Sequence, residues 1–494
     1  MNLADVVDES AREWPAAVAI VEGDRKMTYA GLDDRISAFA AGLLDCGVKP
    51  GDRVALMLGN RLEFVVAFYA TLRAGAVSVP MNPLAPVAET QRQLQQVGAR
   101  LLISDHEAAA QLSQTDEISC AVIAIGSRRW DQLENSTLPE GPADPLDPES
   151  PAVLLFTSGT EGMPQPAVLS HRALLANLQA LQELPEPGRM QPGDVTLAVL
   201  PLFHVYSLTT VLSLGLAAGA TVVLCERFSA PDSLALIQRH RVSVLAAAPP
   251  MYVAWSAEPD LRRALASVRL LMSGAAPLPA DLFDQFSTIN GRPIWEGYGL
   301  TECSPVVSTS LVAGKPVPGS VGKPLPNVEV QIVAEGNTPG DIGEEPGQPG
   351  QIWVRGPSLF SGYWPDGTGG PNDEGWFATG DIGYLNDDGY LFVLARRTDL
   401  ILVSGFNVYP REVEQVLSEM PGLADCAVIG VDHPLTGQAV KALLVVEQGQ
   451  SVPTEAVLTW CEQRLARYKC PTIVEVVAEL PRLTGGKLAR NQLA

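Results

Sequence analysis

The sequence predicts an α/β protein built of layered units with mostly parallel sheets. Through the first half of the chain, short apolar runs alternate with segments of helical periodicity, which is the pattern of strand–helix units. After residue 320 the pattern changes to half-exposed alternating strands, and after residue 396 it becomes short and mixed. At 494 residues, with 44 Gly, 40 Pro and 46% hydrophobic residues, the chain has the size and composition of a loop-rich globular protein of several domains.

The strands of the first half are expected where apolar runs stand between helical patterns. The run 18–21 precedes a helical pattern over residues 29–44, and the run 54–58 precedes another over residues 63–73. We expect the same order through the rest of this half. Its other strands are predicted at residues 76–79, 101–104, 122–125, 152–156, 195–200, 221–224 and 242–246, with a helix at 90–96.

The remainder of the chain is expected to hold two further groups of strands. Strands at residues 328–333 and 351–354 are separated by a Gly-, Pro- and acid-rich stretch, and a second such stretch, 365–375, reads as a surface loop. A domain boundary is predicted near residues 396–399, between an N-terminal domain of residues 1–396 and a C-terminal lobe of residues 397–494. The elements expected in this lobe are helices at 412–417 and 455–465 and strands at 426–431, 442–446 and 473–477.

Charge and composition exclude several classes of protein. The net charge of −22 argues against binding nucleic acid or anionic lipid, because proteins bind both chiefly through Lys and Arg side chains. It does not exclude a nucleotide, because distant charges are screened over about 8 Å at physiological salt. No apolar run is long enough to span a bilayer, and the N-terminus lacks the pattern of a secretory signal. Seven scattered cysteines without paired spacing indicate free thiols in a reducing, cytoplasmic compartment. The five histidines show no metal-ligand spacing.

Two widely separated motifs indicate phosphate chemistry. Directly after the expected strand 152–156, the chain reads Thr157-Ser158-Gly159-Thr160-Glu161-Gly162. Such a turn can aim several backbone N–H groups and hydroxyls at one polyanion. Close to the other end, Gly485-Gly486-Lys487 offers a cation on a flexible stem, which suits developing negative charge. Together they predict an enzyme that handles ATP, with its machinery divided between two parts of the chain.

Further motifs extend this pattern into a family resemblance. With the turn at 157–162, they resemble in order and spacing the adenylate-forming superfamily of acyl-CoA synthetases, peptide-synthetase adenylation domains and luciferases. The resemblance covers the chain from Thr28 to Lys487. The motifs are Gly297-Tyr298-Gly299-Leu300-Thr301-Glu302, Trp376-Phe377-Ala378-Thr379-Gly380-Asp381, Arg396-Arg397-Thr398-Asp399, Ser404-Gly405-Phe406-Asn407-Val408-Tyr409-Pro410-Arg411-Glu412-Val413-Glu414 and Leu480-Pro481-Arg482-Leu483-Thr484-Gly485-Gly486-Lys487.

The resemblance implies both an architecture and a reaction. The N-terminal body would hold layered α/β subdomains and a β-barrel-like subdomain, and the small α+β C-terminal lobe would be mobile. A carboxylate would attack the α-phosphorus of ATP to form an acyl-adenylate and pyrophosphate, and a thiol, usually that of CoA, would then displace AMP. ATP, Mg²⁺ and CoA are therefore the expected cofactor and co-substrates. Neither step needs a covalent enzyme intermediate, so the protein positions groups and stabilises charge.

The resemblance also assigns roles around the nucleotide. Glu302 would hold Mg²⁺, which prefers hard oxygen ligands, and Thr301 would contact the α-phosphate. Asp381 would accept hydrogen bonds from the ribose hydroxyls, and Arg396 would make a second ribose or phosphate contact. The turn residues Thr157, Ser158, Gly159, Thr160, Glu161 and Gly162 would hold the β- and γ-phosphates, with Thr160 also near the metal. The residues beside the adenine and the acyl group would be Gly274, Ala275, Ala276, Tyr298 and Gly299.

Three more segments would act on the α-phosphate, the thiol and the acid. Lys487 would neutralise charge at the α-phosphate and the bridging oxygen during adenylation. Gly405 and Phe406 resemble the loop that moves in for thioester formation. His204, followed by Val205, resembles the gate beside the carboxylate pocket. Taken singly, each of these segments also has a structural interpretation, namely a solvated lysine, a plain turn and a structural histidine. The shared order of the motifs favours the functional interpretation.

Some positions depart from the family pattern. Where most relatives continue the phosphate turn with Pro-Lys-Gly, this chain has Gln165 and Pro166 after Pro164. Gln165 removes a cation near the terminal phosphates, a loss of ~1–4 kcal/mol, and Pro166 removes an N–H donor. We therefore expect weaker ATP binding or slower adenylation. Two positions after Arg396, where relatives pivot and usually have a charged residue, this chain has Thr398, with Asp399 as the substitute pivot residue.

The expected substrate is a carboxylic acid without an α-amino group. Amino-acid-activating relatives usually place an Asp directly after the motif Phe, whereas here Phe203 is followed by His204. The F-H-x-x-x-L pattern looks most like fatty acyl- and aryl-CoA ligases, and a fatty acid is the leading prediction. The alternatives are a fatty acyl-AMP or acyl-carrier-protein ligase, an aryl-CoA ligase, and a non-catalytic member that binds an acyl chain or nucleotide.

Overall fold

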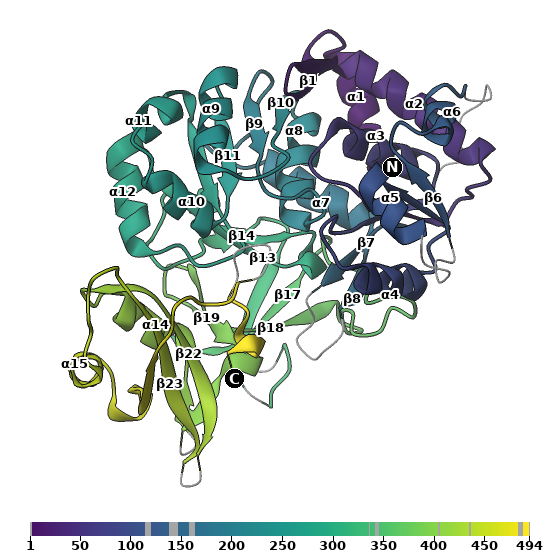
Figure 1. Cartoon of the computed structure of the whole chain (residues 1–494). Coiled ribbons are helices and arrows are strands. Elements are labelled where there is room, and N and C mark those ends of the chain that lie inside the picture. Colours follow the sequence, from purple (N-terminus) through teal and green to yellow (C-terminus); the bar gives the residue numbers. More distant parts are fainter. Residues whose placement is uncertain are drawn as a thin grey trace. The chain divides into compact units, whose positions relative to one another are not determined.

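The computed structural model describes residues 2–113, 120–137, 147–157, 164–334, 336–340, 345–403, 406–433, 436–482 and 488–493. The chain forms two compact units (Figure 1). Unit 1 comprises Met1–Glu329 and Arg355–Phe377, and unit 2 comprises Val330–Val354 and Ala378–Ala494. The boundary near residues 396–399 stays a prediction.

Unit 1 is built on two large sheets, and both confirm the predicted mostly parallel α/β architecture. The first has the order β15-β14-β13-β12-β11-β9-β10-β1-β2 and is parallel from β13 through β1. Its strands are β1 (Val18–Glu22), β2 (Arg25–Thr28), β9 (Val195–Ala198), β10 (Thr221–Leu224), β11 (Val244–Ala247), β12 (Leu270–Ser273), β13 (Ile294–Gly299), β14 (Val306–Thr309) and β15 (Lys323–Pro324).

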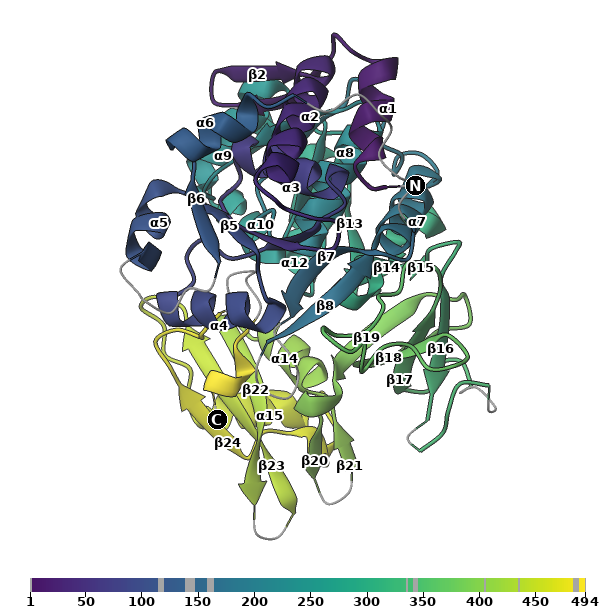
Figure 2. The ribbon, with the colours of Figure 1, turned by 90° about the vertical axis from the view of Figure 1, so that its right-hand side faces the viewer.

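The second sheet of unit 1 has the order β6-β5-β3-β4-β7-β8. It is parallel up to β7, which turns back into the antiparallel strand β8 as a hairpin (Figure 2). The hairpin was not predicted. The strands are β3 (Arg53–Met57), β4 (Val77–Pro80), β5 (Leu101–Ser104), β6 (Ala121–Ala124), β7 (Pro151–Thr157) and β8 (Gln165–Ser170).

Helices cover these sheets, and local sequence explains where several begin. Thr28 and Ser170 cap α2 and α7 by accepting hydrogen bonds from the N–H groups of Gly31 and Ala173. The α3 segment is apolar almost throughout, and it is buried over nearly its whole length. The helices are α1 (Asp5–Glu13), α2 (Tyr29–Asp45), α3 (Leu62–Arg73), α4 (Val87–Val97), α5 (His106–Ser113), α6 (Arg128–Glu134), α7 (His171–Gln182), α8 (Leu214–Ala217), α9 (Ala230–His240), α10 (Pro249–Ser256), α11 (Leu261–Ala264), α12 (Ala280–Asn290) and α13 (Ser310–Ala313), with the π-helix η1 (Ser207–Ser213) and the 3₁₀ turns η2 (Leu265–Ser267) and η3 (Thr301–Cys303).

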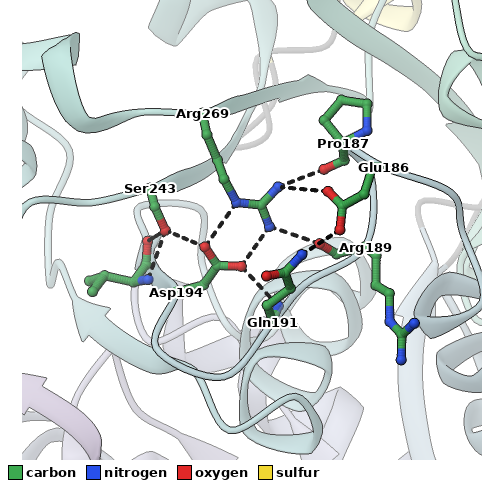
Figure 3. A network of polar contacts seen from close by, with 8 residues as sticks. Glu186, Pro187, Arg189, Gln191, Asp194, Ser243 and Arg269 are labelled. Carbon is green, nitrogen blue, oxygen red and sulfur yellow. Dashed lines mark hydrogen bonds and ion pairs between the residues drawn. The ribbon is translucent and has the colours of Figure 1, made fainter.

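A buried ion pair fixes the amino ends of three neighbouring strands in unit 1 (Figure 3). Arg269, just before β12, meets the Asp194 carboxylate with both Nε (2.9 Å) and Nη2 (2.5 Å). Asp194 precedes β9, and it also accepts a 2.7 Å hydrogen bond from Ser243, which precedes β11. Burial by itself would raise the pKa of Asp194, but the hydrogen bonds from Arg269 and Ser243 hold it below its usual value.

Unit 2 contains most of a four-stranded sheet followed by a compact α+β lobe. The first sheet has the order β16-β17-β18-β19, and the lobe sheet has the order β21-β20-β23-β22 with β24 paired to β23. The core of the lobe includes Val413 of α14, Val457 of α15 and Leu444 of β23. The elements are β16 (Glu329–Val333), β17 (Gly350–Arg355), β18 (Trp376–Leu385), β19 (Leu391–Arg396), η4 (Arg397–Asp399), β20 (Ile401–Val403), β21 (Phe406–Val408), α14 (Pro410–Ser418), β22 (Leu423–His433), β23 (Gly437–Val446), α15 (Thr454–Glu462), η5 (Arg467–Lys469), β24 (Ile473–Val476) and η6 (Arg490–Gln492).

Two global features accord with the composition. All seven cysteines are free thiols. Within the described part of the chain, no helix combines the length and the apolar character needed to cross a membrane.

Candidate nucleotide and acid site

The carboxyl ends of β11, β12 and β13 bring several predicted residues of unit 1 together. In the parallel register Ala247 lies beside Ser273, and Ser273 lies beside Glu296. Gly274 and Ala275 therefore leave the sheet next to the Gly297–Gly299 end of β13. Ligands of open α/β sheets bind outside this edge, where the strands end. The structure thus brings together residues predicted to lie beside the adenine and the acyl group, with Ala275 exposed and Tyr298 half-buried.

The turn after β13 has a shape that only particular residues allow. A Cβ added at Gly299 would lie 2.0 Å from the carbonyl oxygen of Pro305, so this position requires glycine. The same carbonyl accepts a 3.0 Å hydrogen bond from the Leu300 N–H. At the end of β12, Ala275 adopts a φ of +68°, which a non-glycine residue rarely takes. Strained backbone of this kind is concentrated at functional sites.

Glu302, the predicted magnesium ligand, lies half-buried in the short turn η3. Its Oε1 accepts a 2.7 Å hydrogen bond from the hydroxyl of Tyr363, and its carbonyl oxygen accepts a 2.9 Å hydrogen bond from the Phe360 N–H. Behind the turn, the buried amide of Asn177 donates to the carbonyls of Cys303 (3.4 Å) and Val306 (2.9 Å). Neither Tyr363 nor Asn177 was predicted, because both act through tertiary contacts that no motif records.

The residues present fit a magnesium ion that arrives with a nucleotide. Within the described part of the chain, no group of three or more His, Cys, Asp or Glu side chains could hold a metal. A dedicated all-protein site is therefore not found there. Mg²⁺ instead commonly binds through one or two carboxylates together with substrate phosphates and water. The oriented Glu302 carboxylate is the donor this mode needs.

The two strands that flank the predicted phosphate turn, β7 and β8, pair with each other. Thr157, the last residue of β7, pairs with Gln165, the first of β8, and its hydroxyl donates to the Gln165 carbonyl at 3.3 Å. Gln165 is exposed. The remaining predicted turn residues, Ser158, Gly159, Thr160, Glu161 and Gly162, lie outside the described residues.

The predicted acid gate precedes an unpredicted π-helix. His204 is exposed, with its ring centroid 4.5 Å from that of Phe203, and Val205 is buried. The next residue, Tyr206, leads into η1, and π-helical turns are frequent at functional sites. A Cβ added at Gly274 would lie 3.2 Å from the Tyr206 ring, so this segment packs against the end of β12. Burial raises the pKa of the Tyr206 phenol, which keeps it neutral.

Asp381 and Arg396 face each other in unit 2. They are paired across β18 and β19, with Arg396 Nε 2.9 Å from Asp381 Oδ1. Arg396 also donates to the carbonyl of Thr379, and the Thr379 hydroxyl accepts from the Asp381 N–H. Asp381 is only 4% exposed, so the arginine both neutralises and orients a buried carboxylate. The two predicted ribose residues are therefore brought together.

The segments of unit 2 that are predicted to form the hinge and to approach the thiol are described in part. The pKa of Asp399 lies above its usual value, because the effect of burial is larger than the opposing effect of Arg490, whose Nε lies 3.3 Å from Asp399 Oδ2. Phe406 is 56% exposed and its ring stacks on Tyr468 at 4.8 Å between centroids. Tyr468 was not predicted. Gly405 and Lys487 lie outside the described residues.

Two family models match this chain. Residues 7–364 match the family model of the AMP-binding enzymes, and residues 412–487 match the model of the AMP-binding enzyme C-terminal domain. The chain is 32% identical over 532 residues to a long-chain-fatty-acid–CoA ligase of Escherichia coli O157:H7, covering 100% of this chain and 94% of that one. It is 35% identical over 498 residues to a feruloyl-CoA synthase of Amycolatopsis, covering 98% and 96%.

Solved structures of similar proteins extend over the same length. The ATP-bound MatB of Rhodopseudomonas palustris superposes with a TM-score of 0.91 at 30% identity, covering 100% of this chain and 98% of that one. The o-succinylbenzoate-CoA synthetase MenE of Bacillus subtilis, solved with ATP and a magnesium ion, gives a TM-score of 0.84 at 30% identity, with 99% and 98% covered.

Proposed function

Because the chain belongs to the AMP-binding enzymes of the adenylate-forming superfamily, we propose that it uses Mg²⁺ and ATP to join a fatty acid to CoA. The chain is an acid–thiol ligase of the AMP-forming type. The observation that carries the proposal is that Gly274–Ala275 leave the sheet of unit 1 beside the end of β13, which leads into the turn of Glu302. Small residues thus follow β12 and a carboxylate held by Tyr363 follows β13, an arrangement that supports adenylation of an acid.

The first proposed step is adenylation. A carboxylate oxygen of the acid attacks the α-phosphorus, the bond to the bridging oxygen breaks, and pyrophosphate leaves. Glu302 and the phosphates would hold Mg²⁺, which supplies positive charge for the phosphate oxygens. The turn at 157–162 would orient the β- and γ-phosphates, and Thr301 and Lys487 would meet the charge developing at the α-phosphate. Asp381, oriented by Arg396, would accept hydrogen bonds from the ribose.

The second proposed step is thioester formation. The CoA thiolate attacks the acyl carbon, the acyl–oxygen bond breaks, and AMP leaves with that oxygen. The segment containing Gly405 and Phe406 would approach the thiol arm in this step, and the exposed Phe406–Tyr468 stack is an apolar surface suited to it. A carrier-protein thiol in place of CoA is the alternative acceptor. A cytoplasmic location is part of the proposal, since free thiols and a supply of ATP and CoA belong there.

The acid is proposed to be a fatty acid, because no carboxylate follows Phe203 to pair with an α-ammonium and the F-H-x-x-x-L pattern looks most like fatty acyl- and aryl-CoA ligases. An aromatic acid is the second candidate. It is favoured by the ring of Tyr206, which lies against Gly274, and by relatives that include a feruloyl-CoA synthase at 35% identity and a 4-coumarate–CoA ligase at 34% identity.

Pyrophosphate release across a panel of acids tests the proposal. Fatty, hydroxycinnamic, benzoic and amino acids are assayed with and without CoA, and products are identified by mass spectrometry. Release with fatty acids together with acyl-CoA formation is the expected result. Acyl-CoA formed only from hydroxycinnamic acids would transfer the assignment to the aromatic candidate. Release without CoA consumption would indicate a carrier-protein or acyl-AMP ligase, and no release with any acid would contradict catalysis.

A further inference from the structure

Tyr363 is placed so that it controls the carboxylate of Glu302. Its hydroxyl donates to Glu302 Oε1 at 2.7 Å, a contact between residues 61 positions apart in the chain. The phenol has a neutral O–H donor and the carboxylate can only accept, so the contact is a charge-assisted hydrogen bond. It fixes one carboxylate oxygen and thereby the rotation of the whole group.

The backbone around Tyr363 is held to β8, the strand that follows the phosphate turn. The Trp364 N–H donates to the Pro166 carbonyl (2.9 Å), the Ser361 N–H donates to the Val168 carbonyl (2.9 Å), and the Val168 N–H donates to the Gly362 carbonyl (3.0 Å). Tyr363 itself forms an isolated bridge with Ala167. Residues 361–364 therefore act as an added strand on β8, beginning one residue after Gln165.

Side chains make this added strand rigid. The Tyr363 ring packs edge-on against Phe360 at 5.1 Å between centroids. The guanidinium of Arg53 lies 5.4 Å from the centre of the Trp364 ring. Because the Phe360 N–H also donates to the Glu302 carbonyl, residues 360–363 hold both the backbone and the side chain of Glu302. A displacement of β8 would be transmitted directly to the carboxylate.

We propose that Tyr363 is a positioning residue that orients Glu302 for the metal–ATP complex and links that carboxylate to the exit strand of the phosphate turn. The inference rests on the proposed function of Glu302 as the metal ligand. Partners of this kind fix the orientation of a metal-binding carboxylate, and their loss typically lowers metal affinity about 10- to 100-fold. The link matters more in this chain because Gln165 supplies no cation at the start of β8.

The test measures metal binding directly, in the full-length protein with ATP and without any acid. Mn²⁺ is titrated into the protein–ATP complex and followed by electron paramagnetic resonance, for wild type and Tyr363→Phe. We expect Tyr363→Phe to weaken Mn²⁺ binding about tenfold or more. Its affinity for ATP in the presence of a chelator and its rate of CoA transfer from supplied acyl-adenylate are expected to stay unchanged. Tyr29→Phe is the matched control, because it deletes a buried phenol hydroxyl bonded to the carbonyls of Leu216 and Ala220 without touching this segment.

A double-mutant cycle separates positioning from a general structural effect. In a Glu302→Gln background, Tyr363→Phe should change Mn²⁺ binding by less than twofold, because the carboxylate it orients is absent. Equal Mn²⁺ affinity of wild type and Tyr363→Phe, or an undiminished effect in the Glu302→Gln background, would overturn the inference. Since no acid is present, this readout is independent of the acid-panel assay and can fail or succeed separately from it.

Discussion

Single positions decide the shape of the turn that carries Glu302. Gly299 lies so close to the Pro305 carbonyl that no side chain fits, and Asn177 holds the following residues by their carbonyl groups. The motif Gly-Tyr-Gly-Leu-Thr-Glu therefore encodes a tight backbone approach as well as a carboxylate. Gln165, in contrast, is exposed, so its effect on function is expected to come from the absence of a positive charge at this position and not from packing.

Gly299→Ala should deform this turn. The added Cβ would overlap the Pro305 carbonyl, which forces β13 and β14 apart at a cost of roughly 1–3 kcal/mol in unfolding free energy. We expect slower pyrophosphate release together with a lower melting temperature. Gly59→Ala is the control, since its Cβ would meet only Glu226 at an ordinary 3.6 Å. Equal behaviour of the two variants would contradict the steric explanation.

Gln165→Lys should strengthen ATP binding. A lysine here restores a cation close to the proposed position of the terminal phosphates, where one charge pair near the surface contributes ~1–4 kcal/mol. We expect the dissociation constant for ATP, measured by isothermal titration calorimetry, to fall about tenfold. Gln165→Met, of similar length and neutral, controls for the change of side chain. Equal affinities of the Lys and Met variants would show that this position does not face the phosphates.

At the scale of elements, most strands and helices could be predicted because their apolar periodicity is local. The helix predicted at 63–73 is α3 (Leu62–Arg73), and the strand predicted at 221–224 is β10. The β8 strand could not be predicted in the same way, because it follows the polar turn and begins Gln165-Pro166. The π-helix η1 and the Tyr363–Glu302 contact also depend on tertiary packing that the sequence pattern does not contain.

Asp194→Asn should destabilise unit 1 in a pH-dependent way. Replacing this paired, mostly buried carboxylate by a neutral amide is expected to lower the unfolding free energy by about 3 kcal/mol at neutral pH. The folded-state pKa of Asp194 is lowered, so its contribution is complete above the unfolded-state pKa and is lost as the pH falls through the folded-state value. Urea unfolding of wild type and Asp194→Asn is measured from neutral to acid pH. The difference between their unfolding free energies should become smaller as the pH falls.

The control for this measurement is Asp24→Asn. Asp24 pairs with Arg239 at 2.6 Å but its side chain is 92% exposed, so its loss should have little effect at any pH. A difference between wild type and Asp194→Asn that is independent of pH would contradict the ionic origin of the stabilisation.

At the scale of the whole molecule, the proposed machinery is divided between the two units. Unit 1 carries the sheet edge and Glu302, while unit 2 carries the Asp381–Arg396 pair and the lobe with Phe406. The sequence could indicate this division only through the order of its motifs, since local patterns do not report how distant segments meet. We propose that the lobe begins at residue 397, directly after Arg396.

Lys487→Ala should separate the two half-reactions. The ammonium is proposed to meet charge only in adenylation, so pyrophosphate release is expected to fall about 100-fold or more, equivalent to roughly 2.7 kcal/mol. CoA transfer from supplied acyl-adenylate should change little, and Lys487→Arg should retain part of the adenylation rate. Equal loss of both half-reactions would contradict the role given to this lysine.

The transfer of oxygen from acid to nucleotide tests the central claim most directly. The acid is labelled with ¹⁸O in its carboxylate, and the AMP formed in a single turnover with CoA is analysed by mass spectrometry. Attack of the carboxylate on the α-phosphorus followed by thiol displacement predicts one ¹⁸O in the AMP and none in the pyrophosphate. Unlabelled AMP, with the oxygen lost from the acid found in pyrophosphate or inorganic phosphate, would contradict adenylate formation by this chain.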